Sequence, residues 1–328
     1  MANRFDIRLN SLNPLLWQKI ARVDELKGQW KGGSKLHPSI LTQLKKSTLI
    51  TSTGSSTRIE GSSMSDMEIE KLMAGISLRK LSNRDEQEVK GYYELLHNVF
   101  LSWDKIKFSE SCLKHFHKEM LKYAEKDVLH KGDYKKRKNQ EMRELTDWTL
   151  KSFANNSYHP LLIIGNFVVE FLLIHPFEDG NGRLSRILTN FLMLKASYAY
   201  VPYFSHEKLI ENSKSNYYIA LRKSQQTLKT AKEDISAWLD FFLTITLKQA
   251  EQAVDFISNE NRADLLLSKR QAAILELLQK IKEASPKEIF KNTKIPRPTI
   301  NQGLTKLIKI GKIQRLGLGR AVRYRLIV

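Results

Sequence analysis

HPFEDGNGRLSR, residues 175 to 186, lies between an apolar segment at 161–173 and a helical segment that runs from 183 to 195. Gly180 and Gly182 carry no side chain, so their backbone N–H groups can approach an anion closely. Both stand just before the second helix, whose N-terminal amides and dipole favour negative charge. The stretch therefore predicts two helices joined by a phosphate-binding loop.

Four further residues of this stretch suit phosphate chemistry. Arg183 and Arg186 are three residues apart on one helical face, where they can hold further phosphate oxygens. Asp179 offers a hard oxygen ligand for Mg²⁺, and His175 is a base with an ordinary pKa near neutrality. Alone, a histidine is more often structural, a Gly-Asn-Gly is more often a turn, and two arginines are more often a solvated face. Together they indicate nucleotide-phosphate chemistry.

The whole stretch resembles the active-site motif of the Fic family, HxFx(D/E)GNGRxxR, and every specified position is matched. The resemblance implies a protein adenylyltransferase, which moves AMP from ATP to a Ser, Thr or Tyr hydroxyl of a target protein. It implies His175 as general base, Phe177 as anchor of the loop and Asp179 as ligand of Mg²⁺. The ATP-binding residues that it implies are Gly180, Asn181, Gly182, Arg183, Arg186, Tyr217 and Tyr218. For Tyr217 and Tyr218, which resemble residues of an adenine pocket, packing in the core is an equal alternative.

A second segment, Ser56-Thr57-Arg58-Ile59-Glu60-Gly61, matches the family's inhibitory pattern (S/T)xxxE(G/N). By composition alone the Ser- and Thr-rich residues 47–65 indicate a loop. Ser56 and Glu60 are four residues apart, however, and would share one face of a helix. The resemblance implies that Glu60 pairs with Arg186 and keeps the γ-phosphate of ATP from its productive place, with Ser56 and Gly61 in the same motif. An ordinary helix cap is the alternative.

One departure from the family concerns the flap, a β-hairpin that aligns the target protein by strand addition. The segment Gly132-Asp133-Tyr134-Lys135 is present, but Lys138-Asn139-Gln140 leads almost directly into the next helical residues. Either the flap is truncated or residues are missing here. We expect the second case, with a break in the chain between Arg137 and Met142.

The hydrophobic pattern is helical over most of the chain, and the first helix is expected to carry Leu15, Ile20 and Leu26 on one face. Few segments between 103 and 242 alternate as strands do, so we expect a mainly all-α fold. The expected architecture is an N-terminal helical extension with the inhibitory motif (1–89), a Fic helical core (90–255), a linker (256–267) and a small C-terminal winged helix-turn-helix domain (268–328).

The C-terminal region is strongly basic. The chain has a net charge of +19, and residues 265–328 hold 15 Lys and Arg against 3 Asp and Glu. Three expected helices, at 268–282, from Pro286 and from Pro298, precede two short alternating segments, and this order resembles a winged helix-turn-helix. Duplex DNA is the expected partner. The expected DNA-contacting residues are Arg297, Thr299, Asn301, Gln302, Lys306, Arg320 and Arg323. A protein-interaction domain and a solvated basic surface are the alternatives.

Composition excludes several classes of protein. Hydrophobic residues make up 41% of the 328 and charged residues 27%, close to globular averages. No apolar run approaches the roughly 18 residues that a membrane span needs, so no membrane partner is expected. The N-terminus lacks the apolar region of a secretory signal, and Cys112 is the single cysteine. We expect a cytoplasmic protein.

Two other functions stay open at this stage. Within the fold, Glu60 could orient a water that removes AMP from a modified protein, alone or alongside the transfer. In another class, the chain could be a DNA-binding regulator that senses ATP without transferring AMP. The target protein, the DNA site and the oligomeric state, including a homodimer, are not determined by the sequence.

Overall fold

The computed structural model describes residues 3–10, 12–30, 36, 38–75, 81, 83–124, 131–135, 138–258, 267–309, 311–317 and 322–327. Within these ranges the chain forms fifteen α-helices and one small sheet, which confirms the mainly all-α expectation. Contacts divide it into two compact units, one of residues 1–32 and 45–254, the other of residues 33–44 and 255–328. None of the described helices is long and apolar enough to cross a bilayer.

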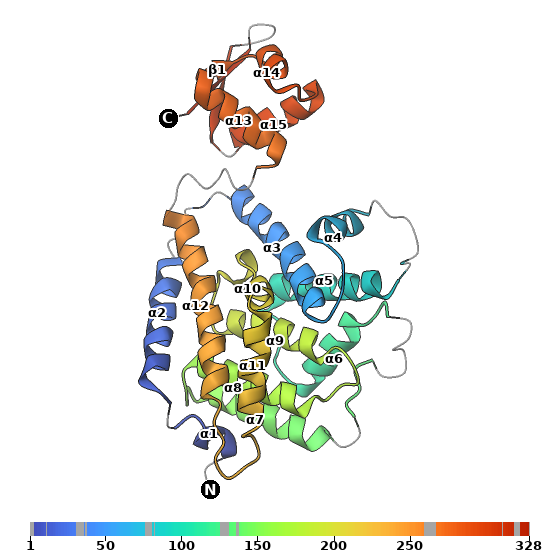
Figure 1. The fold of residues 1–328 in the computed structure, drawn as a ribbon, viewed down its shortest axis with the longest axis vertical. Helices are drawn as coiled ribbons and strands as arrows, with labels where there is room; N and C mark the ends of the chain where they lie inside the picture. Colours follow the sequence, from blue (N-terminus) through green and yellow to red (C-terminus); the bar gives the residue numbers. More distant parts are fainter. Residues whose placement is uncertain are drawn as a thin grey trace. The chain divides into compact units, whose positions relative to one another are not determined.

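The first unit is a helical assembly, shown in Figure 1. Its helices are α1 (Arg4–Ile7), α2 (Pro14–Trp30), α3 (Pro38–Ile59), α4 (Asp66–Met73), α5 (Arg84–Ser102), α6 (Glu110–Met120), α7 (Asn139–Ala154), α8 (Pro160–Ile174), α9 (Asn181–Lys195), α10 (His206–Glu211), α11 (Lys214–Gln225) and α12 (Ser236–Ser258), with a 3₁₀ turn at Val201–Tyr203. α3 and α12 extend across the division between the units.

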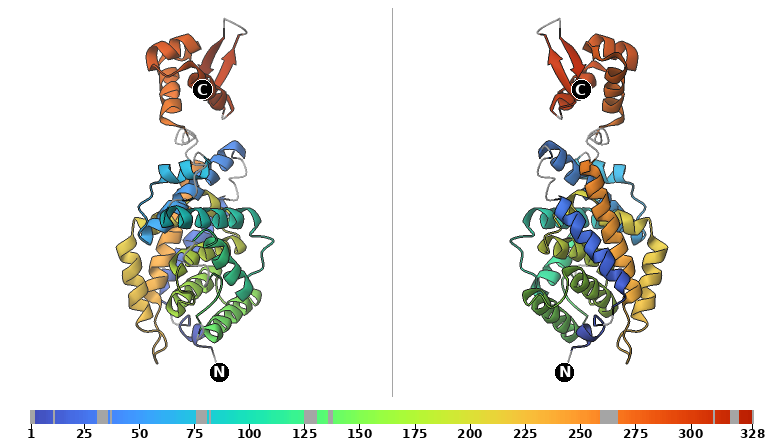
Figure 2. Two further views of the ribbon diagram at one scale, coloured as in Figure 1. Left: turned by 90° about the vertical axis from the view of Figure 1, so that its right-hand side faces the viewer. Right: turned by 90° about the vertical axis from the view of Figure 1, so that its left-hand side faces the viewer.

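α8 and α9 form the core of this unit. Nearly every residue of α8 is buried, and α8 packs against α7 and α9. A helix that is apolar all round is stable only when other helices cover all of it. α2 and α12 run side by side (Figures 1 and 2), and Lys19 Nζ on α2 donates to Asp240 Oδ1 on α12 at 2.6 Å. The loop between α8 and α9, residues 175–180, is therefore fixed at both ends by buried helices.

A buried ion-pair network ties α1 to α8. Arg8 Nη1 lies 2.9 Å from Glu170 Oε2 and 3.0 Å from Glu233 Oε2, and the side chains of Arg8 and Glu170 are fully buried. Arg4 pairs with the same two carboxylates. Because one partner's removal would leave a buried charge without compensation, the network fixes the N-terminal helix in one register.

The Ser- and Thr-rich stretch is helical up to Ile59. The prediction of a loop from its composition is therefore wrong for residues 47–59. Its hydroxyl groups find partners that do not disturb the helix. Thr53 Oγ1 donates to Leu49 O at 2.8 Å and Thr57 Oγ1 to Thr53 O at 2.9 Å. Ser52 Oγ donates to Ser205 Oγ at 2.8 Å. Residues 52–57 are almost entirely buried, so tertiary packing outweighs the low helix propensity of Ser and Thr.

The second unit contains α13 (Lys269–Ile281), α14 (Pro286–Thr293), α15 (Arg297–Lys309) and strands β1 (Glu283–Ala284), β2 (Ile313–Leu316) and β3 (Arg323–Leu326). The strands form an antiparallel sheet in the order β1-β3-β2. The three expected helices and the hairpin are present, whereas β1 was not expected. Capping boxes begin α13 at Ser268 and α14 at Ser285. The helices bury a core that includes Ile274, Leu278, Ile300 and Leu304.

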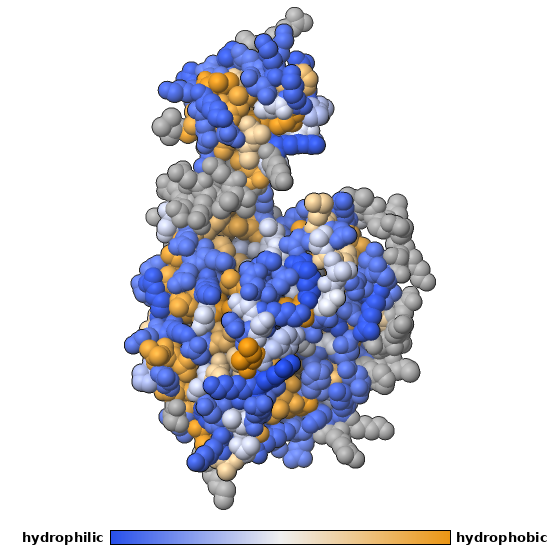
Figure 3. Space-filling model, viewed as in Figure 1, coloured by the Kyte–Doolittle hydropathy of each residue, from blue (hydrophilic) through white to orange (hydrophobic). Residues whose placement is uncertain are grey.

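The surface view in Figure 3 shows mainly hydrophilic residues with scattered apolar ones. Exposed large apolar side chains include Met67 on α4, Leu101 on α5 and Leu150 on α7. Such residues scattered singly are ordinary for a globular protein.

Candidate active site

His175 ends α8 and begins the loop. It adopts a left-handed conformation, with φ 51° and ψ 59°, while its N–H donates to Phe171 O at 2.9 Å. This conformation is uncommon for a residue other than glycine and turns the chain sharply out of the helix. Burial lowers the pKa of the His175 imidazole, and the nearby positive charge of Lys135 lowers it further. The ring is therefore neutral near pH 7 and can accept a proton.

Phe177 anchors the loop in the core. Its side chain is fully buried, and its ring stacks on His117 with centroids 3.8 Å apart and planes 8° apart. Tyr134 meets the same ring edge-on at 5.0 Å. Asn181 closes the loop, because Phe177 N–H donates to Asn181 Oδ1 at 3.0 Å and Asn181 Nδ2 donates to Phe177 O at 2.8 Å. The Asn181 side chain thus holds the loop itself.

His117, on α6, holds the loop through hydrogen bonds of its ring and through stacking on Phe177. Sequence reasoning did not identify this residue. Its Nδ1 accepts from Gly132 N–H at 2.9 Å, so the ring proton belongs on Nε2, which donates to Asp179 O at 3.0 Å. Lys135 N–H also donates to Pro176 O at 2.7 Å. Segment 131–135 is therefore bonded directly to the loop and to its support. A buried histidine on an amphipathic helix carries no sequence signal that sets it apart from a core residue.

The two glycines leave room that no other residue would leave. Gly180 has φ +77°, and a Cβ there would lie 2.6 Å from Met120 Cε. A Cβ at Gly182 would lie 2.2 Å from Glu60 Oε1 and 3.4 Å from Arg186 Nη1. The glycine loop is therefore already close to an anionic group, the carboxylate of Glu60, at the start of a helix, where negative charge is favoured.

Glu60, Ser56 and Arg186 come together as the sequence predicts. Arg186 Nη2 lies 2.8 Å from Glu60 Oε1 and 2.9 Å from Ser56 O, and Arg186 Nε donates to Ser56 Oγ at 2.7 Å. Burial would lower the pKa of the Arg186 guanidinium, but the Glu60 carboxylate together with Tyr217 and Tyr92 outweighs burial, so the pKa is raised. Arg186 Nη1 is buried and has no hydrogen-bond partner in the described part of the chain. Gly61, with φ +106°, ends the turn after Glu60.

Asp179 and Arg183 belong to a closed ring of alternating charges, completed by Arg84 and Glu88 from α5. Asp179 Oδ2 lies 2.9 Å from Arg84 Nη2 and 2.8 Å from Arg183 Nη2. Glu88 lies 2.6 Å from Arg183 Nη1 and 2.6 Å from Arg84 Nε. Burial would raise the pKa of Asp179, but the charge of Arg183 and the N–H of Gly180 prevail, so the pKa is lowered. Arg84 and Glu88 could not be singled out from the sequence, because charge pairs four residues apart are common on helix surfaces.

The residues present fit a Mg²⁺ ion that is held jointly with a nucleotide. No group of three or more acidic, His or Cys side chains that could hold a metal occurs in the described ranges. Mg²⁺ usually needs only one or two carboxylates when phosphates and water supply the remaining ligands. Asp179 is an ionised, partly exposed carboxylate next to the glycine loop. Its ion pairs with Arg84 and Arg183 both use Oδ2.

The two candidate adenine-pocket tyrosines differ. Tyr217 is buried, and its ring contacts Tyr218, Trp238 and Phe241 at centroid distances of 5.0 to 5.8 Å. Burial raises the pKa of Tyr217 to about 12. Tyr218 is only half-buried, and burial raises its pKa as well. Solvent can therefore reach part of the Tyr218 side chain but almost none of the Tyr217 side chain.

No break occurs between residues 138 and 142, which lie in the interval where one was expected. Lys138 N–H donates to Lys135 O at 2.9 Å and Met142 N–H to Lys138 O at 3.1 Å, as α7 begins. The expected break is therefore wrong for residues 138–142, where a helix starts directly. Residues 136 and 137, which complete the interval, lie outside the described residues.

The expected DNA-contacting residues of the second unit have different surroundings. Arg297, Asn301 and Gln302 are exposed, while Thr299 and Lys306 are half-buried. Arg323 is engaged by two carboxylates, Glu283 at 2.8 Å and Glu288 at 3.1 Å. Arg320 lies outside the described residues.

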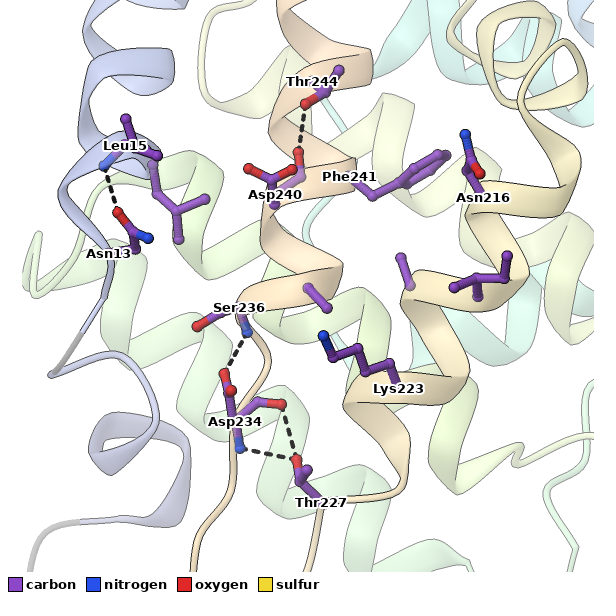
Figure 4. A pocket seen from close by; sticks show the side chains of 14 residues that line it. Asn13, Leu15, Asn216, Lys223, Thr227, Asp234, Ser236, Asp240, Phe241 and Thr244 are labelled. Atoms are coloured by element: carbon purple, nitrogen blue, oxygen red, sulfur yellow. Dashed lines mark hydrogen bonds between the residues drawn. The ribbon is translucent and has the colours of Figure 1, made fainter.

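A cavity of about 630 Å³ opens between the start of α2, α11 and α12 (Figure 4). Its lining mixes polar groups, such as Asn216, Lys223 and Asp234, with Leu15 and Phe241. None of the residues that the sequence motifs single out lines it. The residues that line the cavity therefore include none of the His175 loop.

Comparisons with known proteins agree on one family. Residues 70–193 match the model of the Fic/DOC family. A protein named protein adenylyltransferase Fic from Drosophila willistoni is 29% identical over 136 residues, which cover 40% of this chain and 26% of that protein. A probable protein adenylyltransferase from Aquifex aeolicus is 28% identical over 146 residues, 42% of each chain. The match thus spans about a quarter of the Drosophila protein and less than half of the Aquifex one.

Solved structures show the same fold. The crystal structure of a Fic family protein from Desulfovibrio desulfuricans G20 is similar over 97% of both chains, with a TM-score of 0.64 and 21% identity. Fic-1 from C. elegans is similar over 75% of this chain and 74% of that one, with a TM-score of 0.63 and 18% identity. At identities of 21% and 18%, the similarity is evidence for a shared fold alone.

Proposed function

Because this chain is a Fic family protein, we propose that it transfers AMP from ATP to a hydroxyl group of a protein and that Glu60 holds it inactive. Curated relatives over the matched region are named protein adenylyltransferases, which makes ATP the expected co-substrate. The observation that carries the proposal is the position of the Glu60 carboxylate, against both Arg186 and the glycine loop. An anion already stands where the polyphosphate of ATP would have to bind.

The reaction proposed is an in-line displacement at the α-phosphorus. The neutral imidazole of His175 accepts the proton of the target's hydroxyl group, and the hydroxyl oxygen forms a bond to the α-phosphorus. The bond between that phosphorus and the oxygen that bridges it to the β-phosphorus breaks. AMP remains on the protein and pyrophosphate leaves, so that every atom of ATP is accounted for.

The chain's other residues hold the polyphosphate. The backbone N–H groups at Gly180 and Gly182 and the N-terminus of α9 face its negative charge. Arg183 assists there, and Arg186 binds the γ-phosphate, for which its unpartnered Nη1 supplies a donor. Asp179 would hold Mg²⁺, which neutralises charge on the phosphates when bound. Asn181 and Phe177 keep the loop in shape.

Glu60 opposes this binding in two ways. Its carboxylate occupies Nη2 of Arg186, one of the donors that the γ-phosphate would use, and its charge repels that phosphate. The alternative is the reverse reaction, in which Glu60 orients a water that removes AMP from a protein. AMP released from a modified protein, measured beside incorporation from ATP, separates the two directions.

The proposal is tested by labelling a cell lysate with ATP that carries a tagged adenosine and α-phosphate. Purified Glu60→Gly protein should label at least one other protein, and the same variant with His175→Ala should label none. His115→Ala is a matched control, because His115 is exposed on α6 and should leave labelling unchanged. If labelling survives His175→Ala, the proposed base is wrong. An ATP sensor without transferase activity would bind ATP in all variants and label nothing.

For the second unit we propose a winged helix-turn-helix domain that binds duplex DNA. α15 buries Ile300, Leu304 and Leu307 and leaves Asn301 and Gln302 exposed, so an amphipathic helix presents hydrogen-bonding side chains to solvent. The ion pairs of Arg323 with Glu283 and Glu288 weaken the case for that residue as a DNA contact. Arg297 and α15 are therefore the better candidates for the DNA-binding surface.

A further inference from the structure

Arg58, two residues before Glu60, ties the end of α3 to two other segments. Its Nε lies 2.6 Å from Glu211 Oε1 at the end of α10, and its Nη1 lies 3.0 Å from Asp66 Oδ1 at the start of α4. Nη1 also donates to Met64 O at 2.9 Å, in the turn that follows Gly61. One guanidinium thus bridges the last turn of α3, the turn after it and a helix from a distant part of the chain.

Glu211 holds α3 by a second bond as well. Ser55 Oγ donates to Glu211 Oε2 at 2.8 Å, one helical turn before Arg58. Burial would raise the pKa of Glu211, but its bonds with Arg58, Lys208 and Ser55 outweigh burial and lower the pKa to about 2. The carboxylate is therefore ionised at any physiological pH. Lys208, which is half-buried, contacts Oε2 of the same carboxylate at 2.8 Å.

Gly54, inside α3, leaves room for the ion pair between Arg58 and Asp66. A Cβ at Gly54 would lie 2.5 Å from Arg58 Nη1 and 2.5 Å from Asp66 Oδ1. A glycine inside a helix costs about 1 kcal/mol relative to alanine. Here its lack of a side chain leaves the space in which the guanidinium of Arg58 meets the Asp66 carboxylate.

Glu60 itself is weakly held. α3 ends at Ile59, and Glu60 follows in a turn in which its N–H donates to Thr57 O at 3.1 Å. Its side chain is 34% exposed, and among the described residues it forms a single side-chain hydrogen bond or ion pair, the one to Arg186. Helix ends fray readily unless tertiary contacts fix them. The contacts of Arg58 help to fix this end, beside the bonds of Arg186 to Ser56 and of Ser62 to Asp85.

We propose that Arg58 and Glu211 position Glu60 against Arg186, so that the strength of the autoinhibition is set at this ion pair outside the ATP site. The inference rests on the proposed inhibitory role of Glu60. Breaking the Arg58–Glu211 pair lets the end of α3 move, which lowers the fraction of molecules in which Glu60 occupies Arg186. ATP then binds more tightly, because a larger fraction of the protein is competent to bind it.

The test measures ATP affinity by calorimetry in the presence of Mg²⁺. Variants are Arg58→Ala, Glu211→Gln and Lys208→Ala, each made in the parent chain and in Glu60→Gly. In the parent chain, Arg58→Ala should tighten ATP binding by about three- to tenfold and Glu211→Gln by a smaller factor in the same direction. Lys208→Ala is the matched control, since it loses a contact with the same carboxylate but none with α3, and its affinity should not change.

The Glu60→Gly background distinguishes positioning from general destabilisation. With Glu60 absent, Arg58→Ala and Glu211→Gln should no longer change ATP affinity, because they act through Glu60. A purely structural role would lower the melting temperature in both backgrounds and tighten ATP binding in neither. If Arg58→Ala fails to fold, Glu211→Gln carries the same comparison.

Two negative results have different meanings. If Glu60→Gly tightens ATP binding and neither Arg58→Ala nor Glu211→Gln does so in the parent chain, the positioning role is wrong and the inhibitory role of Glu60 stands. If Glu60→Gly itself leaves ATP affinity unchanged, the inhibitory role is wrong and the positioning role falls with it.

Discussion

The residues that carry the proposed chemistry differ in how visible they are in the sequence. His175, Asp179 and Arg186 stand in a dense motif, and Glu60 stands in a second one, so their proximity could be predicted. Arg84, Glu88 and His117 could not, because each contacts the motif only through the fold. A charged pair on a helix or a lone histidine has many commoner explanations than support of an active site. In the first helix, Leu15 was wrongly grouped with Ile20 and Leu26, since Leu16 is the buried residue.

The charge ring makes a prediction about stability. The side chain of Arg183 is only 3% exposed, and Glu88 is one of its two carboxylate partners. Glu88→Gln should lower the free energy of unfolding by about 1–3 kcal/mol, because a nearly buried cation loses an ionic partner. Glu25→Gln is the control, since Glu25 forms an exposed pair with Arg22 and should change stability by less than about 0.5 kcal/mol. Urea denaturation measures both, and equal effects would contradict the structural role of the ring.

His175 predicts the pH dependence of AMP transfer. Because its pKa is lowered by burial, the base stays unprotonated down to a pH below the ordinary histidine value of 6.5. The acidic limb of the rate of the Glu60→Gly variant should therefore have its midpoint below pH 6.5. A midpoint at or above 6.5 would show that the base is less buried than the structure has it, or that another group titrates.

At the scale of elements, the sequence did not reveal where two helices pack closely at a glycine. In α5, a Cβ at Gly91 would lie 1.9 Å from the backbone oxygen of Met120 at the end of α6. In α2, a Cβ at Gly28 would meet nothing within 4 Å. Both glycines stand inside helical patterns, and only the packing of α5 on α6 tells them apart.

Alanine at these two positions should have opposite effects. Gly91→Ala should destabilise the protein by about 1–3 kcal/mol or more, since backbone must move to admit the methyl group. Gly28→Ala should stabilise it by about 0.5–1 kcal/mol through helix propensity alone. Thermal unfolding compares the two with the parent chain. If Gly91→Ala left the melting temperature unchanged, α5 and α6 would have to pack less closely than described.

At the scale of the whole molecule, the helical character of the chain followed from periodicity, and the order of helices and hairpin at its C-terminal end could be predicted from turn and capping residues. Ser285-Pro286 marks the start of α14, and alternation marks β2 and β3. β1, with two residues, is too short to leave a pattern and forms only because β3 pairs with it. The helix in residues 47–59 was visible only through the inhibitory motif, since its composition indicates a loop.

The basic second unit predicts DNA binding that depends on salt. The intact protein, mixed with a fluorescently labelled duplex, should bind markedly more weakly at physiological than at low salt, because each phosphate contact releases counterions. Arg297→Ala should reduce both the affinity and the salt dependence. Lys280→Ala is the control, as its exposed side chain pairs with Glu276 on α13. Absent or salt-insensitive binding would favour a protein-interaction domain.

The central proposal is that this chain transfers AMP and that Glu60 restrains it. The most direct measurement is incorporation of AMP, from ATP labelled at the α-phosphate, into the protein itself and its target. Glu60→Gly should raise incorporation by an order of magnitude or more, equivalent to about 1.4 kcal/mol in the barrier. Adding His175→Ala should abolish it while ATP still binds. If Glu60→Gly were no more active than the parent chain with the target present, the inhibitory role of Glu60 would be contradicted.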